Sequence, residues 1–435
     1  MGFFTFLLCI VSVQAQQEQG DVKLWSLQAC LDYAQQHNIT LNNLRLAKQS
    51  ADQNLISTRA SVLPDLNASV SQNATHYGTA QGNAAKSISL NGSAGMSSSV
   101  TLFNGGTLQA DISQSHLSTQ MADLALSKAS NDLYLQIIQA YTHIMLDKET
   151  ILYAQDLVQT SHVQTTQMNQ QYRAGAVAKK DLIQLQAQLA SDQYTLTSAQ
   201  NAERQDKITL KQLLQLPVDS HFDIVKADTS FELVAIPTLH EVIQEATAKR
   251  PEVKNSILNI ESTKLDLKKA KAGYLPFISL NGGIGTGYNN GAGIGTFRQF
   301  DNNFYQQIGI TASLPLFSKK VNQTNVAKSK IAIKQAELDL LNTKTLLSQE
   351  IEQAYINTQN AYSQYDASAE QLNYNKEAYR IAGEELRVGS TNTVEYIQQK
   401  NLYIQALQAY TQAKYSAMLS LHVFNFYKGD FLANQ

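Results

Sequence analysis

The sequence contains few residues whose types and spacings could support catalysis or metal binding. Its eight histidines are scattered, and no two stand at the short regular spacing of a metal-binding motif. Residues 282–287 partly match a dinucleotide fingerprint, but more Gly and Asn follow where such a site needs a helix N-terminus. No nucleophile motif, phosphate loop or pair of catalytic carboxylates stands out. We therefore expect no enzyme, no metal site and no cofactor.

Two carboxylates occupy equivalent places in the two halves of the chain. Asp181 and Glu395 each lie six residues after a glycine, and they are 214 residues apart (395 − 181). Carboxylates gathered in a ring would attract cations and repel anions. For Glu395 helix capping is an equally good interpretation, because Asn392 stands three residues before it, as in a capping box. Asp181 has Ala178 at that place, so capping explains it less well.

The equivalence of these positions extends along the whole chain. Leu27–Ala34 recurs as Leu239–Ala246, an offset of 212 (239 − 27). Later landmarks recur at 214, namely Leu102-Phe103 with Leu316-Phe317, Ile137 and Tyr141 with Ile351 and Tyr355, and Arg173-Ala174-Gly175 with Arg387-Val388-Gly389. We predict an internal duplication. The expected organisation is a signal peptide at 1–15, a first repeat at 16–217, a linker at 218–237, a second repeat at 238–428 and a tail at 429–435.

The composition is typical of an exported protein with a polar but nearly neutral surface. Charged residues make up 16% and the net charge is −2, which gives no reason to expect nucleic acid as a partner. An apolar run at 3–13 precedes Val13-Gln14-Ala15, a small-x-small cleavage signal, although no Lys or Arg comes before the run. No stretch of 18 apolar residues follows, which argues against a transmembrane helix.

Glycine and proline are segregated, and this predicts where the helices lie. Neither residue occurs in 107–174, 176–216, 316–382 or 390–428. At 1.5 Å per residue the longest run could span roughly 100 Å. Apolar residues recur every seven positions at Leu340, Leu347, Ala354 and Ala361, which favours a coiled coil over an ordinary helical bundle.

Four other segments alternate between apolar and polar residues, which predicts strands with one face of each kind. They cover about 65–76, 87–103, 277–288 and 304–317, each long enough to cross a membrane as a strand. Long Gly- and Asn-rich loops are expected at 77–86 and 289–303, and aromatic residues near the strand ends suit a membrane boundary.

Four strands are too few to close a barrel, which requires at least eight in a membrane. Three copies would supply twelve strands and leave water inside, as the polar face requires. We therefore predict an internally duplicated α+β membrane protein. Long antiparallel helical hairpins would form an α-barrel, and four strands per protomer would contribute to a trimeric twelve-stranded transmembrane β-barrel.

The order of these features resembles the TolC-like family of outer-membrane efflux channels. The resemblance rests on the doubled Leu-x(6)-Ala opening, the Leu-Pro strand entries at Leu63 and Leu275, Leu102–Gly106, and the turns at 172–177 and 386–391. It implies a homotrimer in the outer membrane of a Gram-negative bacterium, in contact with its lipid, with helices extending into the periplasm. It also implies an equatorial girdle, for which 217–237 and the tail after Gly429 are candidates.

The resemblance further implies a passive exit duct of a tripartite efflux or type I secretion system. A periplasmic adaptor would join it to an inner-membrane pump of RND, ABC or MFS type. The adaptor would touch the hairpin tips at Ala174, Gly175, Ala176, Val388, Gly389 and Ser390. The two glycines suit left-handed turns there. Drugs, metal ions, proteins and lipids all remain possible cargo.

In this family the inner end is closed by rings of acids and by links between helices. The matching gate residues here are Asp181, Glu395 and Gln398, the last replacing an acid of the best-known member. Leu386 and Thr391 replace its latch residues, so Arg173, Arg387 and Thr391 are the latch candidates. The alternative function is a periplasmic coiled-coil adaptor or structural protein without a pore, for which four alternating strands would have no use.

Overall fold

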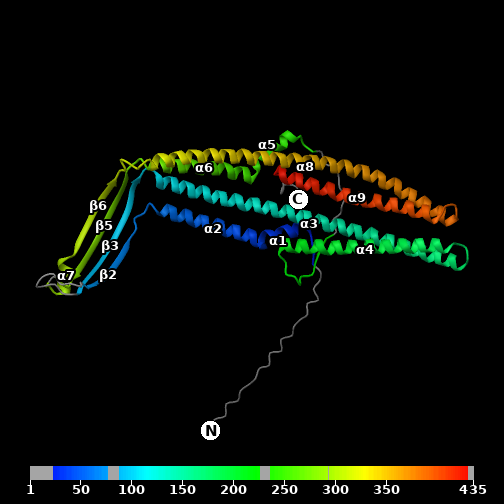
Figure 1. Cartoon of the computed structure of the whole chain (residues 1–435), viewed down its shortest axis with the longest axis horizontal. Coiled ribbons are helices and arrows are strands. Elements are labelled where there is room, and N and C mark those ends of the chain that lie inside the picture. The colour runs from blue at the N-terminus through cyan, green and yellow to red at the C-terminus, as the bar shows by residue number, and fades with distance from the viewer. Residues whose placement is uncertain (1–22, 77–87, 226–235, 292, 430–435) are drawn as a thin grey trace, which may run out of the picture. The chain divides into compact units, whose positions relative to one another are not determined.

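The computed structural model describes residues 23–76, 88–225, 236–291 and 293–429 (Figure 1). The predicted signal peptide and the predicted loop at 77–86 lie outside these residues, as does all of the tail beyond Gly429. None of the helices described is long and apolar enough to cross a membrane.

The helices form two series of matching lengths. The members pair as α1 (Leu27–His37) with α5 (Leu239–Lys249), 11 residues each; α2 (Ile39–Ala60) with α6 (Pro251–Ala272), 22 each; α3 (Thr107–Arg173) with α8 (Val321–Val388), 67 and 68; and α4 (Lys179–Leu214) with α9 (Thr393–Lys428), 36 each. This correspondence supports the predicted duplication. The long helix α8 begins five residues later than the run free of Gly and Pro, and it includes Gly383.

Local capping explains where the shorter helices begin. The Ser26 hydroxyl accepts a hydrogen bond from the Ala29 N–H at 3.2 Å, which satisfies one of the free donors of α1. The equivalent Thr238 forms a capping box with Glu241 at the start of α5. Pro251 begins α6, where its missing N–H costs nothing.

The chain forms two compact units, and these are not the two sequence repeats. Among the described residues, the first unit comprises 23–38, 133–225 and 357–423, and the second comprises 39–76, 88–132, 236–291, 293–356 and 424–429. Each repeat therefore contributes to both units, because α3 and α8 are long enough to run through both.

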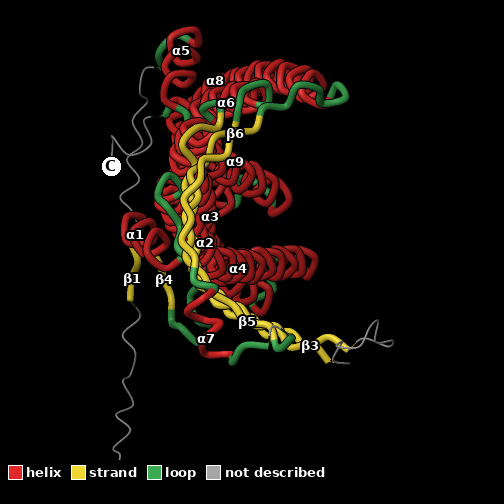
Figure 2. The backbone as a smooth tube through the Cα atoms, turned by 90° about the vertical axis from the view of Figure 1, so that its left-hand side faces the viewer, coloured by secondary structure: helices red, strands yellow, loops and turns green. Residues whose placement is uncertain are grey.

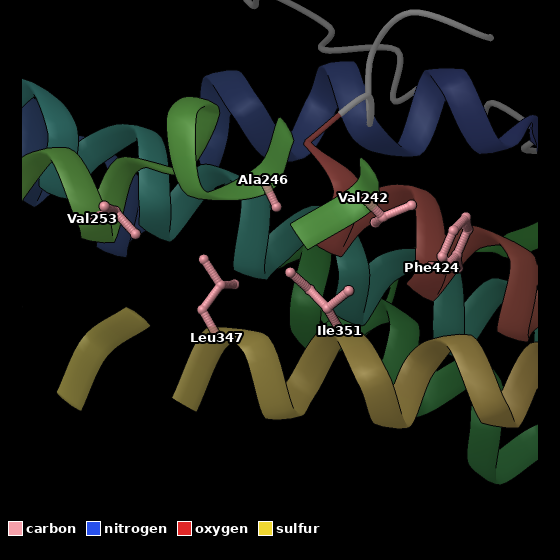
Figure 3. Close-up of a cluster of buried hydrophobic side chains, with 6 residues drawn as sticks. All are labelled: Val242, Ala246, Val253, Leu347, Ile351 and Phe424. Carbon is pink, nitrogen blue, oxygen red and sulfur yellow. The ribbon is translucent and has the colours of Figure 1, made fainter. Parts of the chain in front are cut away.

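The second unit has a hydrophobic core between its helices. Figure 3 shows the six side chains that form it, namely Val242 and Ala246 of α5, Val253 of α6, Leu347 and Ile351 of α8, and Phe424 of α9. Along α8 three of the four predicted seam residues, Leu347, Ala354 and Ala361, are buried, at 2%, 4% and 5% exposed. The fourth, Leu340, is half-buried and packs against this core. Small residues at this spacing allow helices to pack closely.

The second unit also contains a four-stranded antiparallel sheet. Its strands are β2 (Asn67–His76), β3 (Ile88–Asn104), β5 (Phe277–Asn289) and β6 (Tyr305–Ser313), in the order β2-β3-β5-β6 (Figure 1). Figure 2 shows strands in yellow, with β3, β5 and β6 labelled. The central pair, β3 and β5, joins the two halves of the chain. The two edge strands, β2 and β6, each have one side without a strand partner among the described residues.

The strand register places the alternating residues on common faces. Val70 pairs with Ala94 and Met96 with Ile284, while Leu280 pairs with both Val100 and Ile310, so one face is apolar. The opposite face is polar, with Ser71 opposite Ser93 and Ser279 opposite Thr311.

Two residues depart from the predicted alternation. A bulge between Thr101 and Phe103 leaves Leu102 without a partner in the ladder, so Phe103 takes its place opposite Ile278. Tyr305 pairs with Gly285 and shares the polar face with Gln307, so it lies away from the apolar face.

Two predicted segments were wrong. The loop at 289–303 contains a short helix, α7 (Thr296–Asn302), which the buried Gln299 holds by accepting from the Asn289 N–H at 2.8 Å. The last strand ends at Ser313, before Pro315, which has no N–H to offer a ladder. The segment predicted as a linker and girdle candidate contains β4 (Phe222–Ile224), which pairs in parallel with β1 (Lys23–Trp25). Its assignment to a girdle stays a prediction.

Candidate functional site

The candidate site lies at the hairpin tips of the first unit, where two short turns reverse the helix direction. α3 ends at Arg173 and α4 begins at Lys179; α8 ends at Val388 and α9 begins at Thr393. Gly175 and Gly389 have φ values of +78° and +79°, the left-handed conformation expected for these turns.

Matching hydrogen bonds close both turns. The Ala176 N–H donates to the Gln171 carbonyl, and the Ser390 N–H donates to the Glu385 carbonyl, each at 2.9 Å. A bond across five residues after a left-handed glycine is the Schellman pattern, which satisfies carbonyls at the end of a helix. The two tips are therefore built alike.

A cavity of about 570 Å³ lies between the two tips. Its wall combines carboxylate, guanidinium, hydroxyl and apolar groups, among them Asp181, Arg387, Thr391, Val177 and Tyr396. Below it Met168, Leu182, Leu185, Ala382 and Tyr396 form a small hydrophobic core that joins the two hairpins. The tips are thus packed on each other within one chain but keep a cavity with a mixed polar and apolar wall between them.

The structure brings together only some of the predicted gate residues. Asp181 lines the cavity, and no hydrogen bond or ion pair of its carboxylate occurs among the described residues. Glu395 does not line it: its carboxylate accepts from the Thr391 hydroxyl at 2.8 Å, and its N–H donates to the Asn392 side chain at 3.0 Å. The cap therefore comes from Asn392, as the alternative interpretation expected. Gln398 is exposed and also lies outside the cavity wall.

Neither of the latch-candidate arginines, Arg173 and Arg387, pairs with Asp181 within the part of the chain that the structure describes. The Arg387 guanidinium instead binds Glu384, with Nε 2.9 Å from the carboxylate, one turn earlier on the same helix. Arg173 is exposed and lies outside the cavity wall. A salt bridge within one helix needs no tertiary fit, which explains why Arg387 takes the nearer acid.

Sequence reasoning missed a buried ionic cluster deeper in the first unit. The Lys400 side chain is 0% exposed and that of Asp192 is 4% exposed, and Lys400 Nζ lies 2.6 Å from Asp192 Oδ2. Ser161 hydrogen-bonds to both groups, and Gln188 donates to Asp192 Oδ1 at 2.9 Å. Because every polar group of this cluster has a partner, it connects α3, α4 and α9 without a stranded charge.

A tyrosine cluster lies one helical turn from Lys400, on the side of the tips. The Tyr379 and Tyr396 hydroxyl oxygens are 2.8 Å apart, and Gln164 donates to Tyr396. Tyr379 also stacks on Tyr403, with ring centroids 5.2 Å apart. Burial raises the pKa of Tyr379 and Tyr396, so both hydroxyls stay protonated at neutral pH. This cluster adds α8 to the helices held together.

A signal for the ionic cluster was present in the sequence. Asp192 stands seven residues from both Leu185 and Ala199, which are buried, so it occupies a position of the helical seam. Ser161 stands in the same way between Ala154 and Met168. A polar residue at a seam position indicates a buried partner on another helix.

Comparisons with known proteins agree on one family. The family model described as outer membrane efflux protein matches residues 30–215 and 242–421. The pyoverdine export outer membrane protein OpmQ of Pseudomonas putida is 23% identical over 296 residues, which cover 66% of this chain and 58% of that protein's length.

Solved structures share the fold. The CmeC outer membrane channel of Campylobacter jejuni is similar with a TM-score of 0.81 and 18% identity, over 93% of this chain and 86% of that one. The MtrE outer membrane channel of Neisseria gonorrhoeae, in its open state, gives 0.79 and 19%, over 93% and 89%. CusC gives 0.81 and 17%, over 93% and 92%.

Proposed function

Because the chain belongs to the outer membrane efflux protein family, we propose that it forms the passive exit duct of an export system. The family places it in the outer membrane and makes it a transport protein, not an enzyme. As a duct it would be a homotrimer that opens at the hairpin tips when a periplasmic adaptor and an inner-membrane pump of RND, ABC or MFS type engage it.

One observation carries this proposal: the sheet has an apolar face, a polar face and two edges that no strand of the described residues covers. An open strand edge cannot face lipid, because its N–H and C=O groups would lack partners. β6 of one copy would therefore pair with β2 of the next. Three copies close a ring of twelve strands, with the Ser-, Asn- and Thr-rich face toward water.

The tips supply the proposed gate. Asp181 is the gate candidate that lines the cavity, and Glu395 and Gln398 lie on the same hairpin tips. Arg173, Arg387 and Thr391 would link neighbouring copies when the gate is closed. Arg387 and Thr391 are already engaged with Glu384 and Glu395 inside one chain, so a link between copies would exchange these partners. The adaptor would contact the turn residues 174–176 and 388–390.

Native mass spectrometry of the detergent-purified protein tests the duct. Three copies per particle are expected, and a monomer would contradict the proposal, since one chain has too few strands to close.

Planar-bilayer recordings test the gate. Asp181→Ala combined with Glu395→Ala should weaken the preference for cations or increase the open fraction, because a ring of negative charge is removed. Glu377→Ala is a matched control, since this exposed acid on α8 is paired with Arg380 one turn away. Currents identical to wild type in the double variant would exclude both acids from the gate.

A further inference from the structure

The corner between β6 and α8 contains a backbone feature that the proposed duct does not explain. Lys319 and Lys320 have φ values of +49° and +66°, a conformation that residues with a side chain rarely adopt. Such a conformation is strained for a residue with a side chain, and it persists where the surroundings or the function require it.

The duplicated corner shows what the same turn uses elsewhere. Lys319 and Lys320 correspond to Gly105 and Gly106 at the offset of 214, and the glycines have φ values of +68° and +83°. At the first corner a side chain on Gly105 would meet Ala272, with 2.8 Å to its Cβ. The second corner keeps the backbone geometry but replaces glycines, which suit it, with two lysines.

These lysines do not serve local stability. Both are exposed, and no ion pair or hydrogen bond of their side chains occurs among the described residues. They also precede α8 directly, and positive charge near a helix N-terminus opposes the helix dipole. A partner outside this chain would offset these costs.

The surroundings of the lysines identify that partner as lipid. Leu316 and Phe317 are 91% and 83% exposed in the single chain, immediately before the lysines and after the end of β6. Their equivalents Leu102 and Phe103 lie at the end of β3, which has strands on both sides, and are still 55% and 41% exposed. Leu314, which is 51% exposed, follows Ile310 and Ala312 at the same spacing of two residues, and those two residues lie on the apolar face of the sheet. Large apolar side chains followed by cations are typical of a chain that enters lipid and then reaches the anionic headgroups.

We propose that residues 314–320 bind anionic phospholipid at the periplasmic boundary of the membrane. Leu316 and Phe317 enter the acyl region, and the ammonium groups of Lys319 and Lys320 bind headgroup phosphate. The corner lies at this boundary because β6 ends there against Phe277, the first residue of β5 after α6. The proposal rests on the proposed membrane duct.

A lipid titration tests it. Wild-type trimers in detergent micelles would receive phosphatidylglycerol or phosphatidylcholine, and the temperature at which the trimers dissociate would be followed. Phosphatidylglycerol should protect better, and Lys319→Gln with Lys320→Gln should lower its apparent affinity at least about tenfold, since each lysine near an anionic surface contributes about 1 kcal/mol. Added salt should weaken the protection in wild type.

Two further variants separate lipid binding from structure. Lys179→Gln with Lys180→Gln removes a second adjacent lysine pair, at the hairpin tip, and should leave the response to phosphatidylglycerol unchanged. Lys319→Gly with Lys320→Gly should lose the response while the trimers in phosphatidylcholine stay at least as heat-resistant as wild type, because the backbone strain is relieved.

The proposal is overturned if wild type shows no preference for phosphatidylglycerol, or if the Lys319→Gln, Lys320→Gln variant keeps wild-type affinity. Failure of wild type to form trimers at all would instead contradict the proposed duct.

Discussion

At the scale of single residues, the stability of the fold should depend strongly on the buried ion pair between Lys400 and Asp192. Removing one partner of a buried ion pair leaves a charge that neither water nor protein solvates. Lys400→Met should therefore destabilise the protein by about 3–5 kcal/mol. Thermal unfolding of the purified protein measures the loss.

Two further variants test whether the lost stability comes from the unpaired buried charge. Lys400→Met with Asp192→Leu removes both charges and should recover most of the stability, since a matched apolar pair often replaces a buried ion pair well. Arg380→Gln breaks an exposed pair with Glu377 and should have no measurable effect. A double variant as unstable as Lys400→Met would mean that volume, not charge, decides this site.

The carboxyl group of Asp147 should make stability depend on pH. Unlike Asp192, which is paired with a lysine, Asp147 lies near other carboxylates. Burial, followed by the charges of Asp206 and Glu203, raises the pKa of the Asp147 carboxyl to about 7. A raised pKa means that the folded state holds its proton more tightly, so stability falls as pH rises from about 4 to about 7. Asp147→Asn should therefore raise the free energy of unfolding at pH 8 by about 1 kcal/mol, after allowance for partial exposure, and have little effect at pH 4. Thermal unfolding at the two pH values measures this as a higher unfolding temperature at pH 8 only.

The exposed Asp366→Asn serves as its control and should show no such trend with pH. An Asp147→Asn variant that gains equally at pH 4 and pH 8 would show that the carboxylate charge is not the cause.

At the scale of elements, two glycines of the same region should respond in opposite directions. Gly389→Ala places a side chain at φ +79° with nothing within 4 Å to support it, so the backbone cost of roughly 1–2 kcal/mol remains. Gly383→Ala fits inside α8, where the new methyl would lie 3.8 Å from Tyr396, and should stabilise by about 1 kcal/mol. Thermal unfolding of the two single variants checks the signs, and equal signs would contradict the assigned turn.

The strands and turns could be predicted because their signals are local. Alternation at Ile308 and Ile310 or a lone glycine such as Gly389 depends on neighbours in sequence alone. The short helix α7 could not, since its Gly- and Asn-rich setting is typical of a loop and its anchor, Gln299, binds the backbone around it. The Lys400 cluster depends on three helices meeting at one level, which no single helix encodes.

At the scale of the whole molecule, the β3–β5 pairing predicts how copies join. Ser97 pairs with Gly283 across that joint. Shifting these positions by the repeat offsets, 97 + 214 and 283 − 212, places Thr311 opposite Ser71 of the neighbouring copy. Ser71→Cys with Thr311→Cys should therefore give covalent trimers on oxidation, measured on non-reducing gels.

A shifted pair tests the register. Asn73→Cys with Thr311→Cys places the sulfurs on the same face but on a diagonal, about 7–8 Å apart between the backbones, which is too far for a disulfide. Cys30 is buried and should not interfere. Equal cross-linking by both pairs, or by neither, would contradict the inferred joint.

The joint between β3 and β5 has a consequence for the origin of the ring. If it is the same joint that unites neighbouring copies, six half-length chains would make the same succession of contacts as three whole ones. Covalent fusion then forces strict alternation of the halves and lets them diverge. Asp181 can line a cavity while Glu395, its counterpart, accepts a hydrogen bond from Thr391. Six identical subunits could not give the two equivalent positions these different environments.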